Sequence, residues 1–234
     1  MKKVILIPTY NEKENIAALI PKIFSFMPDA FVTVIDDRSP DGTGEAVRGL
    51  QAEYSNVYLM QRDKKEGLGR AYSDAIVHTL KDPNVDIICT MDADLSHNPS
   101  YLPVMTDKIK DCDMVIGSRY VDGGGITDWG KFRRRLSSFG NIYFRRLTGL
   151  PVMDSTSGYA CIRADALRKL SVADLNPTGY AFQCQLKYRL WKQGAKLFEI
   201  PIKFCERKIG KSKISLPIIL EGITMPWHLL WGKK

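Results

Sequence analysis

The 234-residue sequence has no long apolar run and no leader-like N-terminus. No stretch approaches the ~18 uninterrupted apolar residues that a membrane-spanning helix needs, which argues against an integral membrane protein. Only four apolar residues precede Pro8, too few for a secretory signal peptide. These absences lead us to expect a cytoplasmic protein.

Paired cysteine motifs are also missing. The five cysteines are odd in number and widely spaced, and no CxxC occurs, so free thiols in a reducing compartment are the expected state. Internal repeats, low-complexity tracts and linker-like stretches are absent as well. With 44% apolar and 26% charged residues, the chain has an ordinary globular composition.

Positive charge exceeds negative charge, and the excess is unevenly distributed along the chain. The formal net charge is +8, which suggests an anionic partner. Residues 1–118 hold 13 basic and 18 acidic side chains, a net of −5, whereas residues 119–234 hold 21 and 8, a net of +13. A uniformly basic nucleic-acid-binding surface would not divide in this way, and no nucleic-acid-binding motif is found. We therefore expect no nucleic-acid partner.

Short apolar runs alternate with segments of helical period, which predicts an α/β fold with a mostly parallel central sheet and helices on both faces. Asn11 is the expected N-cap of the first helix, with Glu14 completing a capping box. Strands are predicted at 4–7, 31–36, 57–61, 85–91, 114–117, 159–162 and 196–204, and helices at 43–54, 70–80, 99–110, 131–147 and 182–193.

Ligands of such sheets bind beyond the carboxyl ends of the strands. Asp92-Ala93-Asp94 follows the strand at 85–91, so both carboxylates could approach one hard cation such as Mg²⁺ or Mn²⁺. A second Asp-x-Asp triplet begins at Asp111 but precedes a strand, so we assign it to a solvated loop. His97 lies near the first triplet and is a candidate auxiliary contact.

A further acidic group, Asp36, Asp37 and Asp41, follows the strand at 31–36. Adjacent carboxylates raise each other's pKa unless donors or a cation accompany them. A ribose diol or the NH groups of a base would supply such donors. A structural turn with a helix cap is the alternative explanation.

Five motifs follow one another in order: PTYNExxN from residue 8, DDxSPDGT from 36, GLGxAxxxA at 67–75, MDADLSHNP at 91–99 and GSRY at 117–120. Over nearly its whole length the chain resembles the family 2 glycosyltransferases of the GT-A fold, and more narrowly the dolichyl- or polyprenyl-phosphate mannosyltransferases. The resemblance implies a Rossmann-like catalytic domain at 1–213. Its nucleotide-sugar half is 1–118, its acceptor half is 119–213, and an amphipathic tail follows at 214–234.

The resemblance also implies roles for matching positions. Asp92, Asp94 and Ser96 would bind the metal, although Ser96 stands where relatives often have Gln. Arg119 and Arg133 would face the acceptor phosphate, with Ser137 one helical turn after Arg133. Asp94, Arg119 and Arg133 are the residues expected to act in catalysis. The nucleotide sugar would contact Pro8, Tyr10, Glu12, Ile35, Asp37, Asp92, Ala93, Asp94, Arg207 and Lys213.

The implied reaction is metal-dependent, inverting transfer of mannose from GDP-mannose to a dolichyl or polyprenyl phosphate. A lipid monophosphate is already anionic near pH 7, since its second pKa is about 6, so no general base is obligatory. Asp154 is the alternative base candidate. Two other hypotheses remain: transfer of glucose or N-acetylhexosamine from a UDP-sugar, and a non-catalytic, membrane-bound regulatory protein.

The tail ISLPIILEGITMPWHLLWGKK combines aliphatic residues with tryptophan and lysine, a composition typical of membrane interfaces. We expect peripheral attachment to the cytoplasmic face of a membrane, and a core-packing helix is the alternative. The QxxRW motif of processive family 2 polymerases is absent, which argues against polysaccharide synthesis.

Overall fold

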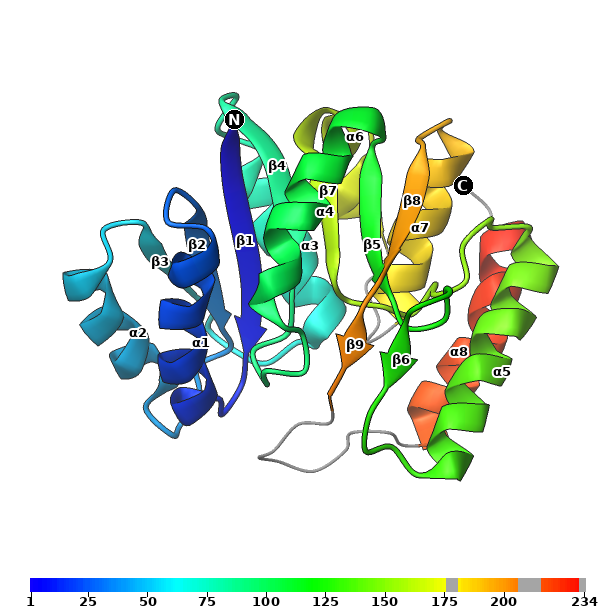
Figure 1. Ribbon diagram of the computed structural model, residues 1–234, viewed down its shortest axis with the longest axis horizontal. Coiled ribbons are helices and arrows are strands. Elements are labelled where there is room, and N and C mark those ends of the chain that lie inside the picture. The colour runs from blue at the N-terminus through cyan, green and yellow to red at the C-terminus, as the bar shows by residue number, and fades with distance from the viewer. Residues whose placement is uncertain (176–180, 206–215, 232–234) are drawn as a thin grey trace.

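A seven-stranded sheet forms the centre of the protein. The computed structural model describes residues 1–175, 181–205 and 216–231 (Figure 1). The sheet order is β3-β2-β1-β4-β7-β5-β8, and β7 alone runs antiparallel to its neighbours β4 and β5. The strands are β1 (Lys2–Thr9), β2 (Phe31–Asp36), β3 (Val57–Gln61), β4 (Val85–Thr90), β5 (Met114–Ser118), β7 (Ala160–Arg163) and β8 (Leu197–Pro201).

Helices cover both faces of this sheet (Figure 1). A second, two-stranded parallel sheet pairs β6 (Gly125–Ile126) with β9 (Lys203–Phe204). The helices are α1 (Lys13–Phe26), α2 (Thr43–Glu53), α3 (Leu68–Thr79), α4 (Leu102–Lys108), α5 (Lys131–Thr148), α6 (Ala164–Arg168), α7 (Ala181–Lys192) and α8 (Leu216–Trp231). The mostly parallel α/β architecture predicted from the sequence is confirmed.

Side-chain alternation along β1 explains the two apolar layers. Val4 and Leu6 point into one core, which contains Tyr72 of α3 and residues of α7. Ile5 and Ile7 point into the other core, against α1 and α4. Because neighbouring side chains of a strand leave opposite faces, a continuous apolar run is needed where both faces are covered.

Strands β1, β2, β4 and β5 have their carboxyl ends at one edge of the sheet, the lower edge in Figure 1. After β1 the chain adds β2 and β3 on one side and then crosses to add β4 on the other. A crevice for ligands lies outside the strands at such a reversal. The fold therefore places the acidic motifs of β2 and β4 and the GSRY motif of β5 at the same edge.

Three local predictions are wrong. Glu12, not Asn11, is the N-cap of α1, and no side chain of the cap residue closes it. Instead the loop after β2 caps the helix: Asp41 Oδ2 accepts from Lys13 N at 3.1 Å, and Thr43 Oγ1 accepts from Glu12 N at 3.1 Å. These acceptors lie about one βα unit away in sequence, so a local capping pattern could not reveal them.

The predicted strand at 196–204 is divided. Its first part is β8 in the main sheet, and its second part is β9, which leaves that sheet to pair with β6. The predicted helix at 99–110 is likewise shorter, since α4 is flanked by 3₁₀ turns at Pro99–Tyr101 and Ile109–Asp111. For the strand, pairing with β6 decided what local propensity left open.

Residues 216–231 of the predicted tail form α8, which packs against α5 and α7. Tyr143 of α5 donates its hydroxyl to the Ile223 carbonyl at 3.0 Å and accepts from Trp227 Nε1 at 2.8 Å. Among the three described ranges, no helix is long and apolar enough to cross a membrane.

Candidate active site

Asp92 and Asp94 follow β4 at the carboxyl edge, and both side chains are half-buried. Ala93 between them is buried, so the two carboxylates flank an apolar anchor. Both acidic charges act on Tyr72, whose pKa is raised well above its ordinary value by burial and then by these two charges. The Tyr72 hydroxyl donates to the Met91 carbonyl at 3.2 Å, which holds the start of this segment.

His97 contacts the acidic segment through the backbone of Asp92. Its Nδ1 accepts a hydrogen bond from the Asp92 backbone N–H at 3.0 Å, so its proton resides on Nε2, 3.9 Å from Asp92 Oδ2. The ring stacks on Tyr159 and meets the edge of Phe204. Burial lowers the pKa of His97, although Asp92 and Asp94 oppose the shift. The structure thus gives His97 a role in holding the Asp92 backbone.

The donor set at this edge fits a hard divalent cation. Mg²⁺ commonly uses one or two carboxylates and completes its shell with water and substrate phosphates. Within the described part of the chain, no three His, Cys, Asp or Glu side chains form a cluster that could hold a metal ion. Ser96 is buried and donates its hydroxyl to Asp94 Oδ1 at 2.5 Å. It therefore orients one predicted ligand.

The acidic group after β2 is largely held by protein donors. Asp36 is fully buried and accepts from Ser39 Oγ at 2.5 Å and Thr9 Oγ1 at 3.2 Å. Asp41 accepts from Thr43 Oγ1 at 2.6 Å, and these hydrogen bonds lower its pKa although burial acts against them. The structural-turn interpretation therefore holds for Asp36 and Asp41.

Asp37 differs, because its partner is a buried arginine that the sequence analysis missed. Arg62, directly after β3, donates to Asp37 Oδ1 at 2.7 Å, and both side chains are 7% exposed. Arg62 also pairs with Glu66 at 2.9 Å and Asp74 at 3.2 Å. Burial raises the pKa of Asp37, and Arg62 opposes that shift. A lone arginine after a strand carries no local signal of this network.

The other predicted nucleotide contacts lie around the end of β1. Pro8, Tyr10 and Glu12 are half-buried, and Lys65 Nζ lies over the Tyr10 ring, 3.7 Å from its centroid. Glu12 accepts from Asn15 Nδ2 at 2.7 Å. Ile35 is fully buried in the core, so its side chain faces the sheet interior and its carbonyl accepts from Thr9 Oγ1 at 3.1 Å.

Arg119, in the GSRY motif after β5, is bound by a buried carboxylate. Asp154 Oδ2 accepts from Arg119 Nε at 2.8 Å and from its backbone N at 3.0 Å, and Oδ1 accepts from Nη2 at 2.7 Å. The side chains are 8% and 0% exposed, respectively. Burial favours a higher pKa for Asp154, but Arg119 lowers the pKa overall. With both oxygens engaged in this way, Asp154 serves as the partner of Arg119.

The segment that carries Asp154 is itself held from several elements. Thr156 Oγ1 accepts from Arg119 Nη2 at 2.7 Å. Asn141 of α5 accepts from Ser155 Oγ at 2.7 Å, and Glu199 of β8 accepts from the Asp154 backbone N at 2.9 Å. These partners come from distant parts of the sequence, so spacing alone could not identify them.

Arg133 is the arginine of α5 that faces this cluster, whereas Arg134 and Arg135 are exposed. Its guanidinium lies over the Trp129 ring at 4.0 Å from the centroid, and Arg119 approaches the same ring at 5.7 Å. Trp129 therefore brings the two predicted acceptor arginines together. Ser137 lies one turn further along α5, beside the Tyr120 hydroxyl.

The acidic and basic parts of the site approach each other around His97 and Phe204, because the Phe204 ring lies 5.6 Å from the His97 ring and 5.4 Å from the Arg119 guanidinium. The charges of Asp92, Asp94, Arg119 and Asp154 all act on His97. Predicted residues Arg207 and Lys213 lie outside the described residues.

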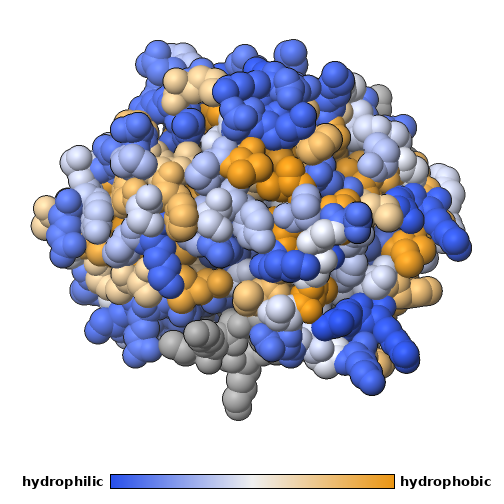
Figure 2. All heavy atoms as spheres, in the orientation of Figure 1, coloured by the Kyte–Doolittle hydropathy of each residue, from blue (hydrophilic) through white to orange (hydrophobic). Residues whose placement is uncertain are grey.

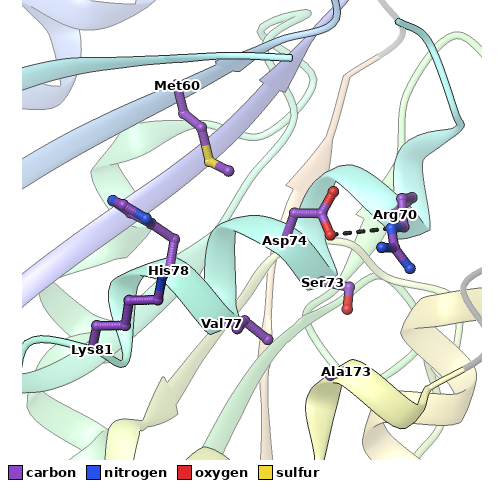
Figure 3. Close-up of a pocket in the computed structure, with 8 residues that line it drawn as sticks. All are labelled: Met60, Arg70, Ser73, Asp74, Val77, His78, Lys81 and Ala173. Carbon is purple, nitrogen blue, oxygen red and sulfur yellow. Dashed lines mark ion pairs between the residues drawn. The ribbon is translucent and has the colours of Figure 1, made fainter. Parts of the chain in front are cut away.

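A separate pocket of about 310 Å³ runs along α3 (Figure 3) and contains none of the predicted site residues. Its Arg70–Asp74 ion pair of 3.1 Å connects it to the Arg62 network.

Comparisons with known proteins show the family to which the chain belongs. Residues 4–171 match the glycosyl transferase family 2 domain. The chain is 38% identical to an undecaprenyl-phosphate mannosyltransferase of Micrococcus luteus, covering 96% of this chain and 92% of the relative. It is also 38% identical to a polyprenol monophosphomannose synthase of Mycolicibacterium smegmatis, covering 95% and 84%.

A mannosyltransferase from Pyrobaculum calidifontis, solved with GDP-Man and Mn²⁺, superposes with a TM-score of 0.68. The match covers all of this chain and 65% of that one at 16% identity, and it shows the GT-A fold. The sequence relatives extend over nearly the whole chain, including the segments that carry the carboxylates and Arg119. The chain is therefore a glycosyltransferase and belongs to glycosyl transferase family 2.

Proposed function

We propose that this protein transfers mannose from GDP-mannose to a polyprenyl phosphate at the carboxyl edge of the sheet. The observation that carries the proposal is the meeting of an acidic pair, Asp92 and Asp94, with a carboxylate-held arginine, Arg119, around His97. One side suits a metal-bound diphosphate, and the other suits a second phosphate. The sequence relatives, named an undecaprenyl-phosphate mannosyltransferase and a polyprenol monophosphomannose synthase, support mannose as the sugar and a polyprenyl phosphate as the acceptor.

On the donor side, Asp92 and Asp94 would hold Mg²⁺ or Mn²⁺, which supplies charge stabilisation to the departing diphosphate. Ser96 keeps the Asp94 carboxylate oriented, and His97 fixes the Asp92 backbone. Binding of the metal by the Ser96 hydroxyl is a separate question, which the Ser96→Ala variant tests. Arg207 and Lys213 would add positive charge toward the donor phosphates.

On the acceptor side, Arg119 and Arg133 would receive the lipid phosphate against Trp129. An acceptor phosphate oxygen forms a bond to the sugar C1 while the bond from C1 to the diphosphate oxygen breaks, and GDP leaves with the electron pair. Attack from the face opposite the leaving group inverts the anomeric centre. The acceptor is already anionic, so no proton has to be removed, and Asp154 remains bound to Arg119.

Peripheral attachment to a membrane forms a second part of the proposal. Helices α5 and α8 lie side by side (Figure 1) and expose large apolar side chains. Figure 2 shows hydrophobic and strongly hydrophilic residues intermixed over this side of the protein. The exposed residues are Phe132, Phe139, Ile142, Leu220, Ile223, Trp227, Leu230 and Trp231.

Charge on α5 supports an anionic lipid surface as the partner. The helix has six basic residues and no acidic one. A basic helix with exposed aromatics binds anionic interfaces through both apolar burial and charge. Co-sedimentation with vesicles containing anionic lipid should fall on Trp231→Ala and at high salt. Equal binding to neutral and anionic vesicles would contradict the charge contribution.

Incubation with labelled GDP-mannose, Mn²⁺ or Mg²⁺, and a polyprenyl phosphate tests the reaction. The expected result is a lipid-soluble labelled product that disappears with EDTA. Thermal-shift titration with GDP and with UDP, each with Mn²⁺, separates the alternative of a UDP-sugar donor, because the cognate nucleotide stabilises the folded state more. Absence of lipid product from both donor classes would refute the proposed function.

A further inference from the structure

Beneath the acceptor side lies a lysine with no part in the proposed reaction. Lys187 of α7 is fully buried. Its Nζ donates to the Ser157 carbonyl at 2.6 Å, to the Ser155 carbonyl at 3.0 Å and, more weakly, to the Gln183 carbonyl of its own helix at 3.5 Å. Burying an ammonium group is strongly unfavourable unless it is hydrogen-bonded, and these carbonyls provide that compensation.

We propose that Lys187 is a positioning residue for the acceptor phosphate. The two carbonyls that it binds flank Thr156, so the ammonium fixes both ends of the short segment that contacts Arg119. Asp154, at the start of that segment, holds Arg119 through Nε and Nη2. Lys187 therefore acts on the acceptor through Asp154, Thr156 and Arg119. This inference rests on the proposed function.

Other elements hold the same segment, but they do so with different chemistry. Asn141 of α5 contacts the Thr156 hydroxyl at 3.2 Å. Glu199 of β8 accepts from the Met153 and Asp154 backbone N–H groups at 2.7 and 2.9 Å. Asn141 is neutral and Glu199 is acidic, so Lys187 adds positive charge from α7. That charge lies in a region where the proposed acceptor is an anion.

The charge on Lys187 is sensitive to pH near neutrality. Burial lowers the pKa of Lys187 to about 8, Arg119 contributes in the same direction, and Cys184, Asp154 and Glu199 oppose the shift. The lipid phosphate has finished its second ionisation well below this pH, since that pKa is about 6. A change in acceptor affinity between pH 7 and 9 is therefore expected to follow Lys187.

As pH rises, the stability of the fold and the affinity for the acceptor should change in opposite directions. The pKa of Lys187 in the folded protein lies below its unfolded value of about 10.4, so between these values the unfolded chain binds more protons. This group therefore makes the fold more stable as pH rises through about 8. Loss of the ammonium charge loosens the segment that holds Arg119, so the acceptor KM rises over the same range.

Lys187→Met tests the proposal because it keeps the chain length and removes the charge and donors. The matched control is Lys192→Met, an exposed lysine on the same helix. For Lys187→Met we expect the KM for polyprenyl phosphate to rise about tenfold and the KM for GDP-mannose to stay within about twofold, since a buried polar network near one substrate is disrupted. Equal changes in both KM values, or no change, would overturn the proposal.

The pH profile gives an independent readout. In the wild-type protein the acceptor KM should rise between pH 7 and 9, and in Lys187→Met it should be flat. If that variant does not fold, the wild-type profile decides, and a KM independent of pH overturns the proposal. Absence of lipid product from the wild type would instead refute the proposed function. In that case, hydrogen–deuterium exchange of residues 153–158 in Lys187→Met tests whether Lys187 holds this segment. Protection equal to that of the wild type would overturn the proposed role of Lys187.

Discussion

The two halves of this protein, which we propose bind the donor and the acceptor, hold charged side chains by opposite means. In the donor half, the carboxylate of Asp37 is bound by a buried cation, Arg62. In the acceptor half, the cation of Arg119 is bound by a buried carboxylate, Asp154. The first half has a net charge of −5 and buries a cation beside a carboxylate. The second half has a net charge of +13 and buries a carboxylate beside a cation.

The two arrangements differ in how the counter-charge is shared. Arg62 serves Asp37, Glu66 and Asp74, whereas Asp154 gives both oxygens to Arg119. Without Arg62, water can still reach Glu66 and Asp74, which are 40% and 29% exposed, whereas Arg119 is only 8% exposed and would remain a buried charge without its carboxylate. Of the two counter-charges, we therefore expect the loss of Asp154 to cost more than the loss of Arg62.

The largest effect should come from Asp94, which is proposed to hold the metal on the donor side. Asp94→Ala should reduce metal-dependent transfer by about 10³-fold, because the charge that develops on the leaving diphosphate loses its main support. The melting temperature should stay close to that of the wild type. Asp111→Ala, in the other Asp-x-Asp triplet, is the matched control, since Asp111 makes an exposed ion pair with Lys108. Comparable losses in both variants would contradict the assignment.

Asp154→Asn should impair use of the lipid phosphate without affecting the nucleotide. We expect a fall of about 100-fold in kcat/KM for the lipid phosphate and a loss of about 3 kcal/mol in the free energy of unfolding, because a buried arginine loses its charge partner. GDP binding, measured by thermal shift, should remain unchanged. A general base would behave differently: kcat would fall while the acceptor KM stayed constant.

Acid titration tests the same pair without kinetics. The pKa of Asp154 is lowered in the folded protein, so its stabilising contribution is present above the ordinary value of about 3.9 and is lost as pH falls through the lowered value. Wild-type protein should therefore lose more stability than Asp154→Asn between pH 5 and 2 in denaturant unfolding. Parallel curves for the two proteins would refute the contribution of this ion pair.

Arg62→Met is the mirror experiment in the donor half. GDP affinity should fall about tenfold because Asp37 loses a buried partner, and the acceptor KM should not change. Stabilisation by GDP with Mn²⁺ reports the affinity. Arg48→Met, which removes an exposed arginine paired with Glu45, is the control. A rise in acceptor KM as large as the loss of GDP affinity would remove the distinction between the halves.

The smallest effect should come from Ser96→Ala. If Ser96 only orients Asp94, activity should fall less than about tenfold, in keeping with one lost hydrogen bond. The concentration of Mn²⁺ needed for half-maximal activity should change little. A large increase in that concentration would instead show that the hydroxyl binds the metal.

The alternation of apolar runs and helical segments was enough to predict the mostly parallel sheet, because backbone geometry and burial act over short distances. The order of the motifs after strands β1, β2, β4 and β5 likewise predicted that they share one edge. The choice of Arg133 over its two neighbours agrees with its packing on Trp129.

The sequence by itself therefore determined the family, the fold and the residue types at the carboxyl edge. Only the tertiary structure decided which charges are paired: Arg62 with Asp37, Arg119 with Asp154, and Lys187 with the Ser155 and Ser157 carbonyls. The physical reason is distance along the chain. These partners come from separate strands and helices, and no local pattern records which buried charge meets which when the sheet and helices pack.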